Sequence, residues 1–164
     1  MKNSKKLVLL ALVLILLAST LVAGAYAMKY ARVYQDQSRT VGLGNAGITY
    51  ASAYKDGTVQ VLRRDDSGYH APYNHVHVEK LLEVRFYDLN WTRDRYASGA
   101  VWVWYDLTGK EMKLWDAGLL SIKYYDTWKN QWKACPTFEL KGGSRVACRV
   151  YAYGVYGLVA RQLP

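Results

Sequence analysis

Three side chains near the middle of the chain have the types and spacing that a metal site needs. His75, His77 and Glu79 alternate along HVHVE, so in an extended strand they share one face. Imidazole and carboxylate groups at this spacing can reach one metal ion. The competing interpretation is a solvated strand face, and we favour it. We therefore expect no bound metal and no cofactor, and keep a metal-dependent enzyme built on His75 and His77 as the third hypothesis.

Other catalytic patterns are absent from the sequence. The chain contains no Gly-x-Ser-x-Gly motif, no phosphate-binding glycine loop and no cysteine–histidine pair with the spacing of a known nucleophile. Asp65 and Asp66 lack the alternating acidic ligands of a calcium loop and fit a turn better. We therefore expect that the protein is not an enzyme.

The most aromatic stretch, AVWVWYD at residues 100–106, offers a different chemistry. Trp102 and Trp104 fall on one face of the expected strand, and the residues of the other face are equally apolar. One interpretation, which we favour, makes the Trp pair the core and covers the other face with a loop. The other makes the pair a flat platform for sugar rings or for a neighbouring subunit. Further tyrosines on predicted outer faces could extend that platform: Tyr125, Tyr151 and Tyr153.

The two cysteines of the chain are Cys135 and Cys148. In an exported protein they would favour a disulfide, which for a loop of this length stabilises the fold by about 3 kcal/mol in the chain-entropy relation. Strand parity argues the other way, because it places Cys148 on the core face and Cys135 on the polar face. A bulge at Pro136 would restore a shared face. Both outcomes stay open: a disulfide, or a buried Cys148 with a separate Cys135.

The elements that position these residues read as strands. Residues 119–160 alternate between apolar and polar types at period two, which predicts a β-meander. In its central hairpin we expect Phe138 to lie opposite Val146, with residues 141–143 as a three-residue loop. The even-numbered residues of the first arm would then form its core face: Trp132, Ala134, Pro136, Phe138 and Leu140.

Upstream, Asp56-Gly57 between the apolar runs 46–54 and 58–63 predicts a second hairpin. Residues 76–88 read as one strand, with Val76, Val78, Val84 and Phe86 pointing inward. We find about nine short strands and no helical pattern after residue 27. The expected fold is therefore all-β: a two-sheet antiparallel β-sandwich, immunoglobulin-like or jelly-roll-like, preceded by an N-terminal hydrophobic helix.

Three runs near the C-terminus carry a family resemblance: VWVWYDLTG, LLSIKYYDTWKNQWKACPT and VACRVYAYGVYGLVA. Together they resemble the last strands of immunoglobulin-like sandwich domains of exported prokaryotic surface proteins. The resemblance covers about residues 100–160, and residues 28–99 show no family signature. It implies a structural or adhesive module and brings no catalytic residues with it.

The first 27 residues predict a secretory signal peptide. Lys2, Lys5 and Lys6 precede an uncharged run, and small residues at Ala25 and Ala27 fit a cleavage site. The run is also long enough to stay in a bilayer, so residues 7–27 can instead be a membrane anchor. In both cases we expect residues 28–164 to form a single sandwich domain that is secreted or lies at the cell surface.

Charge limits the class of partner. The full chain carries a formal charge of +9, and without residues 1–27 there remain 19 Lys and Arg against 13 Asp and Glu, or +6. This excess fits an anionic surface or an acidic envelope polysaccharide, whereas no basic cluster has the density typical of nucleic-acid binding.

Together these observations favour a non-catalytic module with a structural, adhesive or assembly role, whose partner is a second copy or an envelope polysaccharide. A carbohydrate-binding module is the alternative.

Overall fold

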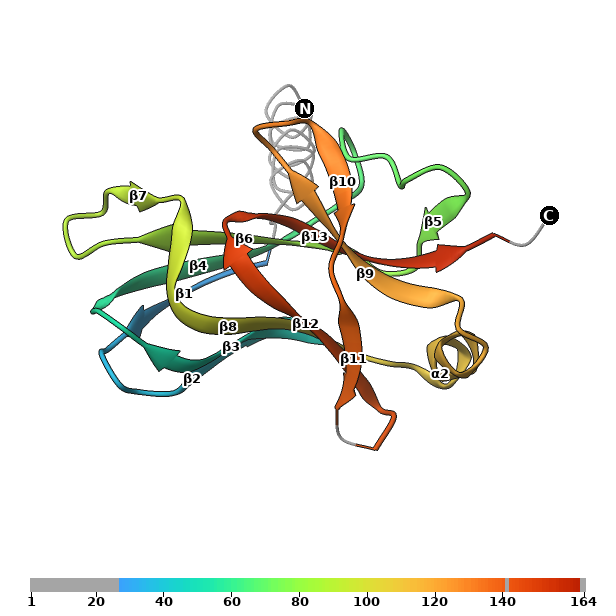
Figure 1. The fold of residues 1–164 in the computed structure, drawn as a ribbon, viewed down its shortest axis with the longest axis horizontal. Coiled ribbons are helices and arrows are strands. Elements are labelled where there is room, and N and C mark those ends of the chain that lie inside the picture. The colour runs from blue at the N-terminus through green and yellow to red at the C-terminus, as the bar shows by residue number, and fades with distance from the viewer. Residues whose placement is uncertain (1–26, 141, 163–164) are drawn as a thin grey trace, which may run out of the picture.

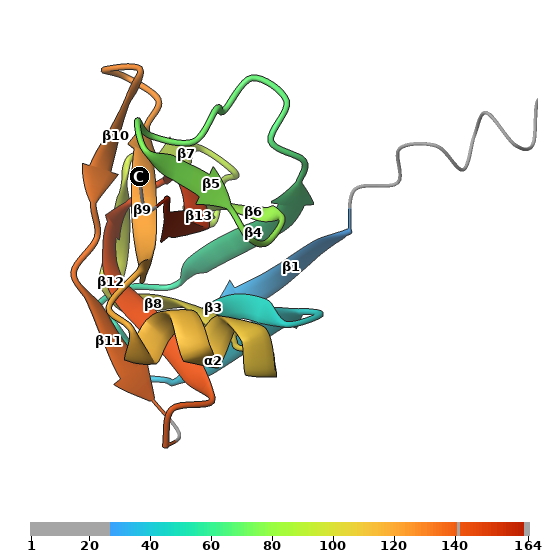
Figure 2. The ribbon, with the colours of Figure 1, turned by 90° about the vertical axis from the view of Figure 1, so that its right-hand side faces the viewer.

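In its described part the chain folds as two antiparallel β-sheets that face each other, with a short helix at one end (Figures 1 and 2). A computed structural model describes residues 27–140 and 142–162, without the side chain of Tyr151. The leader expected at residues 1–27 thus lies outside the described residues, apart from Ala27. The prediction of an all-β fold with two antiparallel sheets is confirmed.

The larger sheet has a path of six strands with two short strands beside it. In spatial order they are β1 (Met28–Val33), β4 (Gly57–Arg64), β6 (Leu81–Tyr87), β13 (Gly154–Arg161), β9 (Leu120–Asp126) and β10 (Gln131–Ala134), with β5 (His75–His77) beside β13 and β7 (Arg93–Asp94) beside β6.

The smaller sheet has five strands. In spatial order they are β11 (Thr137–Leu140), β12 (Arg145–Ala152), β8 (Tyr96–Asp106), β3 (Ala46–Ala53) and β2 (Arg39–Leu43).

The core fills the space between the sheets. The alternation read from the sequence holds here, since Val59 and Val61 of β4 and Val101 and Val103 of β8 are fully buried. Tyr105 is fully buried in this core, where its hydroxyl donates to the carbonyl oxygen of Tyr156 at 2.8 Å. Burial raises the pKa of that hydroxyl, so it stays protonated and keeps donating at any ordinary pH.

The hairpin predicted at Asp56-Gly57 is wrong. β3 and β4, on either side of this dipeptide, belong to different sheets, because β3 pairs with β2 and β8 while β4 pairs with β1 and β6. Asp56 instead accepts a hydrogen bond from the backbone N–H of Gln35 at 2.7 Å, which links the β3–β4 connection to the β1–β2 connection. A turn sequence of this type therefore predicts that the chain reverses direction, but it does not predict in which sheet the next strand pairs.

The core face predicted for residues 132–140 is also wrong. This segment is not one strand, since β10 lies in the larger sheet and β11 in the smaller, with the crossing at Cys135 and Pro136. Phe138 pairs with Ala147 rather than Val146, and Leu140 pairs with Arg145, so the connection has four residues. A shift of one residue turns the strand over, and Phe138 and Leu140 are each 38% exposed on the outer face.

A short helix, α2 (Gly109–Asp116), forms in a part of the chain where the sequence showed no helical pattern. Thr108 caps it: its hydroxyl accepts from the backbone N–H of Glu111, and the Glu111 carboxylate accepts from the backbone N–H of Thr108 at 2.6 Å. Trp115 donates its indole N–H to Glu139 of β11 at 3.3 Å, which holds the helix against the smaller sheet.

The strand predicted at residues 76–88 is two strands, β5 and β6. Val84 and Phe86 are buried as expected, and Val78 is half-buried against the core. Val76 is 40% exposed, so its inward assignment is wrong. β5 pairs only with the end of β13, at the margin of the sheet, where one strand face does not meet the core.

Candidate functional site

The outer face of the smaller sheet carries the Trp pair. Val101, Val103 and Tyr105 are all fully buried, so the alternation of β8 turns Trp102 and Trp104 away from the core. The interpretation we favoured from the sequence, with the Trp pair as the core, is therefore wrong. Both faces of β8 are apolar, but the sandwich uses the valine face, whose branched side chains pack well between two sheets.

Trp104 lies across its neighbouring strands on this outer face. In the register of the sheet, Gly42 of β2 and Gly47 of β3 follow Trp104 in one row. A Cβ atom added at Gly47 would overlap the indole ring, and one at Gly42 would lie 3.4 Å from it. The two glycines thus make room for the ring, which is only 5% exposed. Its indole nitrogen is buried and has no hydrogen-bond partner among the described residues.

Arg145 covers the other side of this ring. Its guanidinium carbon lies 3.7 Å from the centre of the Trp104 ring, within cation–π distance. Its Nε and Nη2 atoms donate to the two carboxylate oxygens of Asp106, at 2.6 and 2.8 Å. The arginine is therefore held in place by a two-bond ion pair, and it neutralises Asp106 beside the indole.

Because of this cover, an open platform of two coplanar indoles does not form. Instead a groove of about 330 Å³ lies on the sheet. We call it the Trp groove, and its lining residues are Thr49, Trp102, Trp104, Phe138, Leu140 and Arg145. Thr49 and Arg145 are its polar members. Trp102 is half-buried, whereas Phe138 and Leu140 of β11 are exposed.

The tyrosines expected to extend the platform do not join this groove. Tyr125 lies on the larger sheet, with its ring centre 5.0 Å from that of Tyr69 and 5.2 Å from that of Trp132. Tyr153 lies beyond the end of β12, against Arg93 and Trp128. Tyr151 belongs to β12, and its side chain is outside the described part of the chain.

The side chains of the metal hypothesis have separate partners. The His75 ring contacts the carbonyl oxygen of Tyr73 at 2.8 Å, and the His77 ring contacts that of Tyr69 at 2.8 Å. Glu79 accepts from Arg63 at 3.1 Å. Among residues 27–140 and 142–162, no three histidine, cysteine, aspartate or glutamate side chains gather in a way that could hold a metal ion.

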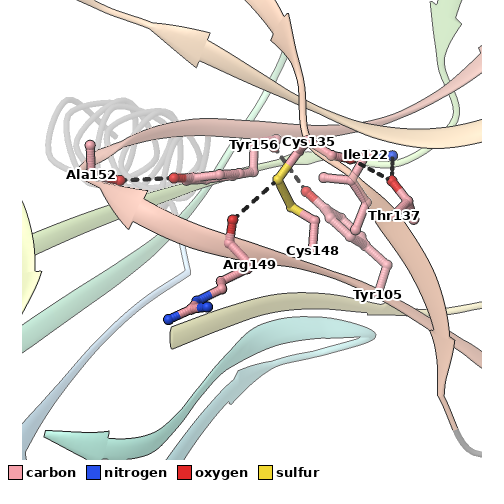
Figure 3. Close-up of a disulfide and its surroundings, with 8 residues drawn as sticks. All are labelled: Tyr105, Ile122, Cys135, Thr137, Cys148, Arg149, Ala152 and Tyr156. Carbon is pink, nitrogen blue, oxygen red and sulfur yellow. Dashed lines mark hydrogen bonds between the residues drawn. A yellow bond between two sulfur atoms is a disulfide. The ribbon is translucent and has the colours of Figure 1, made fainter. Parts of the chain in front are cut away.

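Cys135 and Cys148 are joined by a disulfide, with their Cα atoms 5.7 Å apart (Figure 3). Because Thr137 pairs with Cys148 across β11 and β12, odd residues of the first arm lie on the inner face, which the parity argument did not foresee. The Thr137 hydroxyl accepts from the backbone N–H of Ile122 at 2.8 Å and donates to the Cys135 carbonyl at 2.9 Å. The disulfide thus fastens the point where the chain changes sheets.

Two features of the groove were missed in the sequence analysis, namely the cover over Trp104 and the outward position of β11. Signals for the first exist in the sequence, since Asp106 and Arg145 have opposite charges and glycines are dense at 42–47. The outward position of β11 depends on the strand register, which no single residue determines.

No helix among the described residues is long and apolar enough to cross a membrane. Comparison of the chain with protein families, with curated protein sequences and with solved structures finds no match.

Proposed function

We propose that the chain is a non-catalytic, extracytoplasmic sandwich module of immunoglobulin-like type that assembles with a second copy of itself through the Trp groove. One observation carries the proposal: the Trp pair lies on the outer face of a sheet around an open apolar groove, instead of in the core. Large apolar side chains clustered on an outer face mark contact sites. Tryptophan and arginine are also the residues that most often dominate the energy of protein interfaces.

The groove fits a second copy because the same face carries a hollow and the side chains that could fill it. Phe138 and Leu140 line the groove from β11, and each keeps more than a third of its surface exposed. In a twofold dimer the same patch contacts itself, so Phe138 of each copy would enter the groove of the other. The Arg145–Asp106 pair at the margin is already neutral and would not repel its symmetry mate.

A sugar is the weaker candidate for this groove. A sugar ring needs several hydrogen bonds to replace those it makes with water. Thr49 and Arg145 are the polar lining residues, and Arg145 is engaged by Asp106. Carbohydrate binding through the groove therefore remains the second hypothesis, which the experiment below separates from self-association.

Two features support the extracytoplasmic part of the proposal. The disulfide favours an oxidising compartment, and the N-terminal residues have the composition of an export signal. The immunoglobulin-like part rests on the resemblance of residues 100–160 and on the two-sheet antiparallel architecture.

The test is sedimentation equilibrium of the protein produced from the full-length chain, up to about 100 µM, together with the variant Phe138→Asp. We expect a concentration-dependent dimer, weakened about tenfold or more by the charge placed in the apolar contact. Tyr54→Asp is the matched control, because Tyr54 is an aromatic residue 71% exposed outside the groove.

A monomer at every concentration, or equal loss in both variants, would contradict self-assembly through the groove. Binding of neutral glycans that is lost in Trp102→Ala but kept in Tyr54→Asp would establish the second hypothesis instead.

A further inference from the structure

A second cluster of aromatic and cationic side chains lies at the end of the sandwich away from α2. Figure 1 shows the segments that form it, β7 with the start of β8, the β9–β10 turn and the β12–β13 turn, gathered opposite the helix. We call it the stacked-arginine patch, and its members are Arg93, Arg95, Tyr96, Trp128 and Tyr153.

Arginine and aromatic side chains alternate in this patch. The Arg93 guanidinium lies 4.1 Å from the centre of the Tyr153 ring. The Arg95 guanidinium lies 5.0 Å from the ring of Trp128 and 5.3 Å from that of Tyr96. Trp128 and Tyr96 are 63% and 59% exposed, so the rings also offer free surface to a ligand. Stacking on a ring leaves the edge of a guanidinium, with its N–H donors, free to bind an anion.

Hydrogen bonds hold the backbone segments that carry these side chains. The N–H of Tyr153 donates to the carbonyl oxygen of Arg95 at 3.0 Å, which ties the β12–β13 turn to the start of β8. Asp126 accepts from the backbone N–H groups of Trp128 and Lys129, at 3.0 and 3.3 Å, and so sets the turn that presents the indole. A site whose parts are held before the ligand arrives loses less entropy on binding.

The acidic residues nearest in the chain are already paired. Asp94 forms an ion pair with Lys55 at 3.1 Å, and Asp126 forms one with Lys133 at 2.6 Å. In the portion of the chain that the structure describes, Arg93 and Arg95 make no ion pair. Within the described residues, the patch thus keeps two positive charges that no carboxylate neutralises.

We propose that the stacked-arginine patch binds an anionic polysaccharide. A uronic acid or sulfated sugar carries a ring and a charged group on one unit, and the patch offers an indole and a guanidinium at 5.0 Å from each other. Trp128 packs against the sugar ring, while Arg95 donates two parallel hydrogen bonds to the carboxylate or sulfate. Arg93 takes the anionic group of a neighbouring sugar along the polymer.

This inference is independent of the proposed assembly, because the patch shares no residue with the Trp groove. Two arginines in a short row match a polymer with one charge on each sugar. A nucleic acid or an anionic membrane presents a denser charge to a broader basic surface.

The experiment measures binding of the protein from the full-length chain to polygalacturonate, with neutral galactan as the uncharged control. We expect binding to polygalacturonate only, with a loss of about tenfold in Arg95→Gln and in Trp128→Ala. Arg39→Gln and Tyr73→Ala are matched controls, because Arg39 is exposed on β2 and Tyr73 is 90% exposed in the loop before β5. Both controls should bind as the wild type does.

Arg95→Lys separates charge from geometry, because it keeps the charge and loses the planar fork, and we expect a loss of several-fold. The proposal is overturned if Arg39→Gln loses as much as Arg95→Gln, or if galactan binds equally well. It is also overturned if single-stranded DNA or anionic phosphatidylglycerol vesicles bind more tightly than polygalacturonate through the same arginines. Thermal melting of each variant shows whether a loss of polygalacturonate binding comes from unfolding. If Arg95→Gln does not fold, Arg95→Lys is the variant that decides.

Discussion

Removing the disulfide gives the sharpest test of how the two sheets are joined. Cys135 and Cys148 are 13 residues apart, and the chain-entropy relation for such a loop gives about 3 kcal/mol of stabilisation. For a sandwich of residues 28–164, the entropy of unfolding converts this loss to a fall in melting temperature of about 10 °C. Cys148 is fully buried and Cys135 nearly so, so each substitution also removes some packing.

The assay is urea unfolding of the wild type, of Cys135→Ser, of Cys148→Ala and of the double variant, each with and without reductant. A single bond predicts non-additive losses: either substitution breaks it, so each single variant and the double variant should all lose about 3 to 4 kcal/mol. Reductant should destabilise the wild type alone. If the single losses instead add in the double variant, or if fully reduced wild type keeps its stability, the reasoning about this crossing is refuted.

Three further predictions concern local contacts, each measured by urea unfolding. Gly47→Ala should destabilise the fold by more than about 2 kcal/mol, because the new Cβ overlaps the Trp104 ring and nearby backbone atoms. Gly44→Ala is the control: its Cβ meets no atom, so it should cost only about 1 kcal/mol for the positive φ at this position. Equal losses of stability in the two variants would contradict the packing of Trp104 on Gly47. Thr108→Ala should cost about 1 kcal/mol by removing the cap of α2, and no loss would contradict the cap. A hydrogen bond from the Lys133 ammonium lowers the pKa of the Asp126 carboxyl. The ionised carboxylate therefore stabilises the fold at pH values above the ordinary pKa of 3.8, and this stabilisation is lost as the pH falls through the lowered pKa. Asp126→Asn should therefore destabilise at pH 7, with a difference that narrows in acid; a constant difference would contradict it.

Strand alternation in the sequence predicts the inner face of a strand correctly where one face is clearly more apolar than the other. Alternation along β12 places Cys148 on the core face, and its inward position is confirmed. The capping pair Thr108 and Glu111 could also have been found, since it has the spacing of a capping box. It was missed because a helix of two turns has too few residues to show a clear period.

The errors arise where a choice depends on partners that are distant in the sequence. Asp56-Gly57 has the composition of a hairpin turn, but β4, the strand that follows it, pairs in the other sheet. Both faces of β8 are apolar, so the sequence of this strand does not show which face packs against the second sheet. In the structure the face of Val103 does, and the face of Trp104 does not. The register beyond Pro136 changes by one residue, and that shift alone exposes Phe138.

One difference between the two surfaces makes the proposals separable in a single experiment. Both place an arginine on an aromatic ring, but Arg145 is neutralised by Asp106, whereas Arg95 has no ion-pair partner among the described residues. Contacts in the Trp groove are therefore apolar and should change little with salt, while anion binding at the patch is screened. Between about 50 and about 300 mM sodium chloride, self-association should hold or strengthen and polygalacturonate binding should fall several-fold. If both fall together, the groove acts through charge and its assignment as an apolar contact fails. If neither falls, the arginines of the patch do not meet an anion.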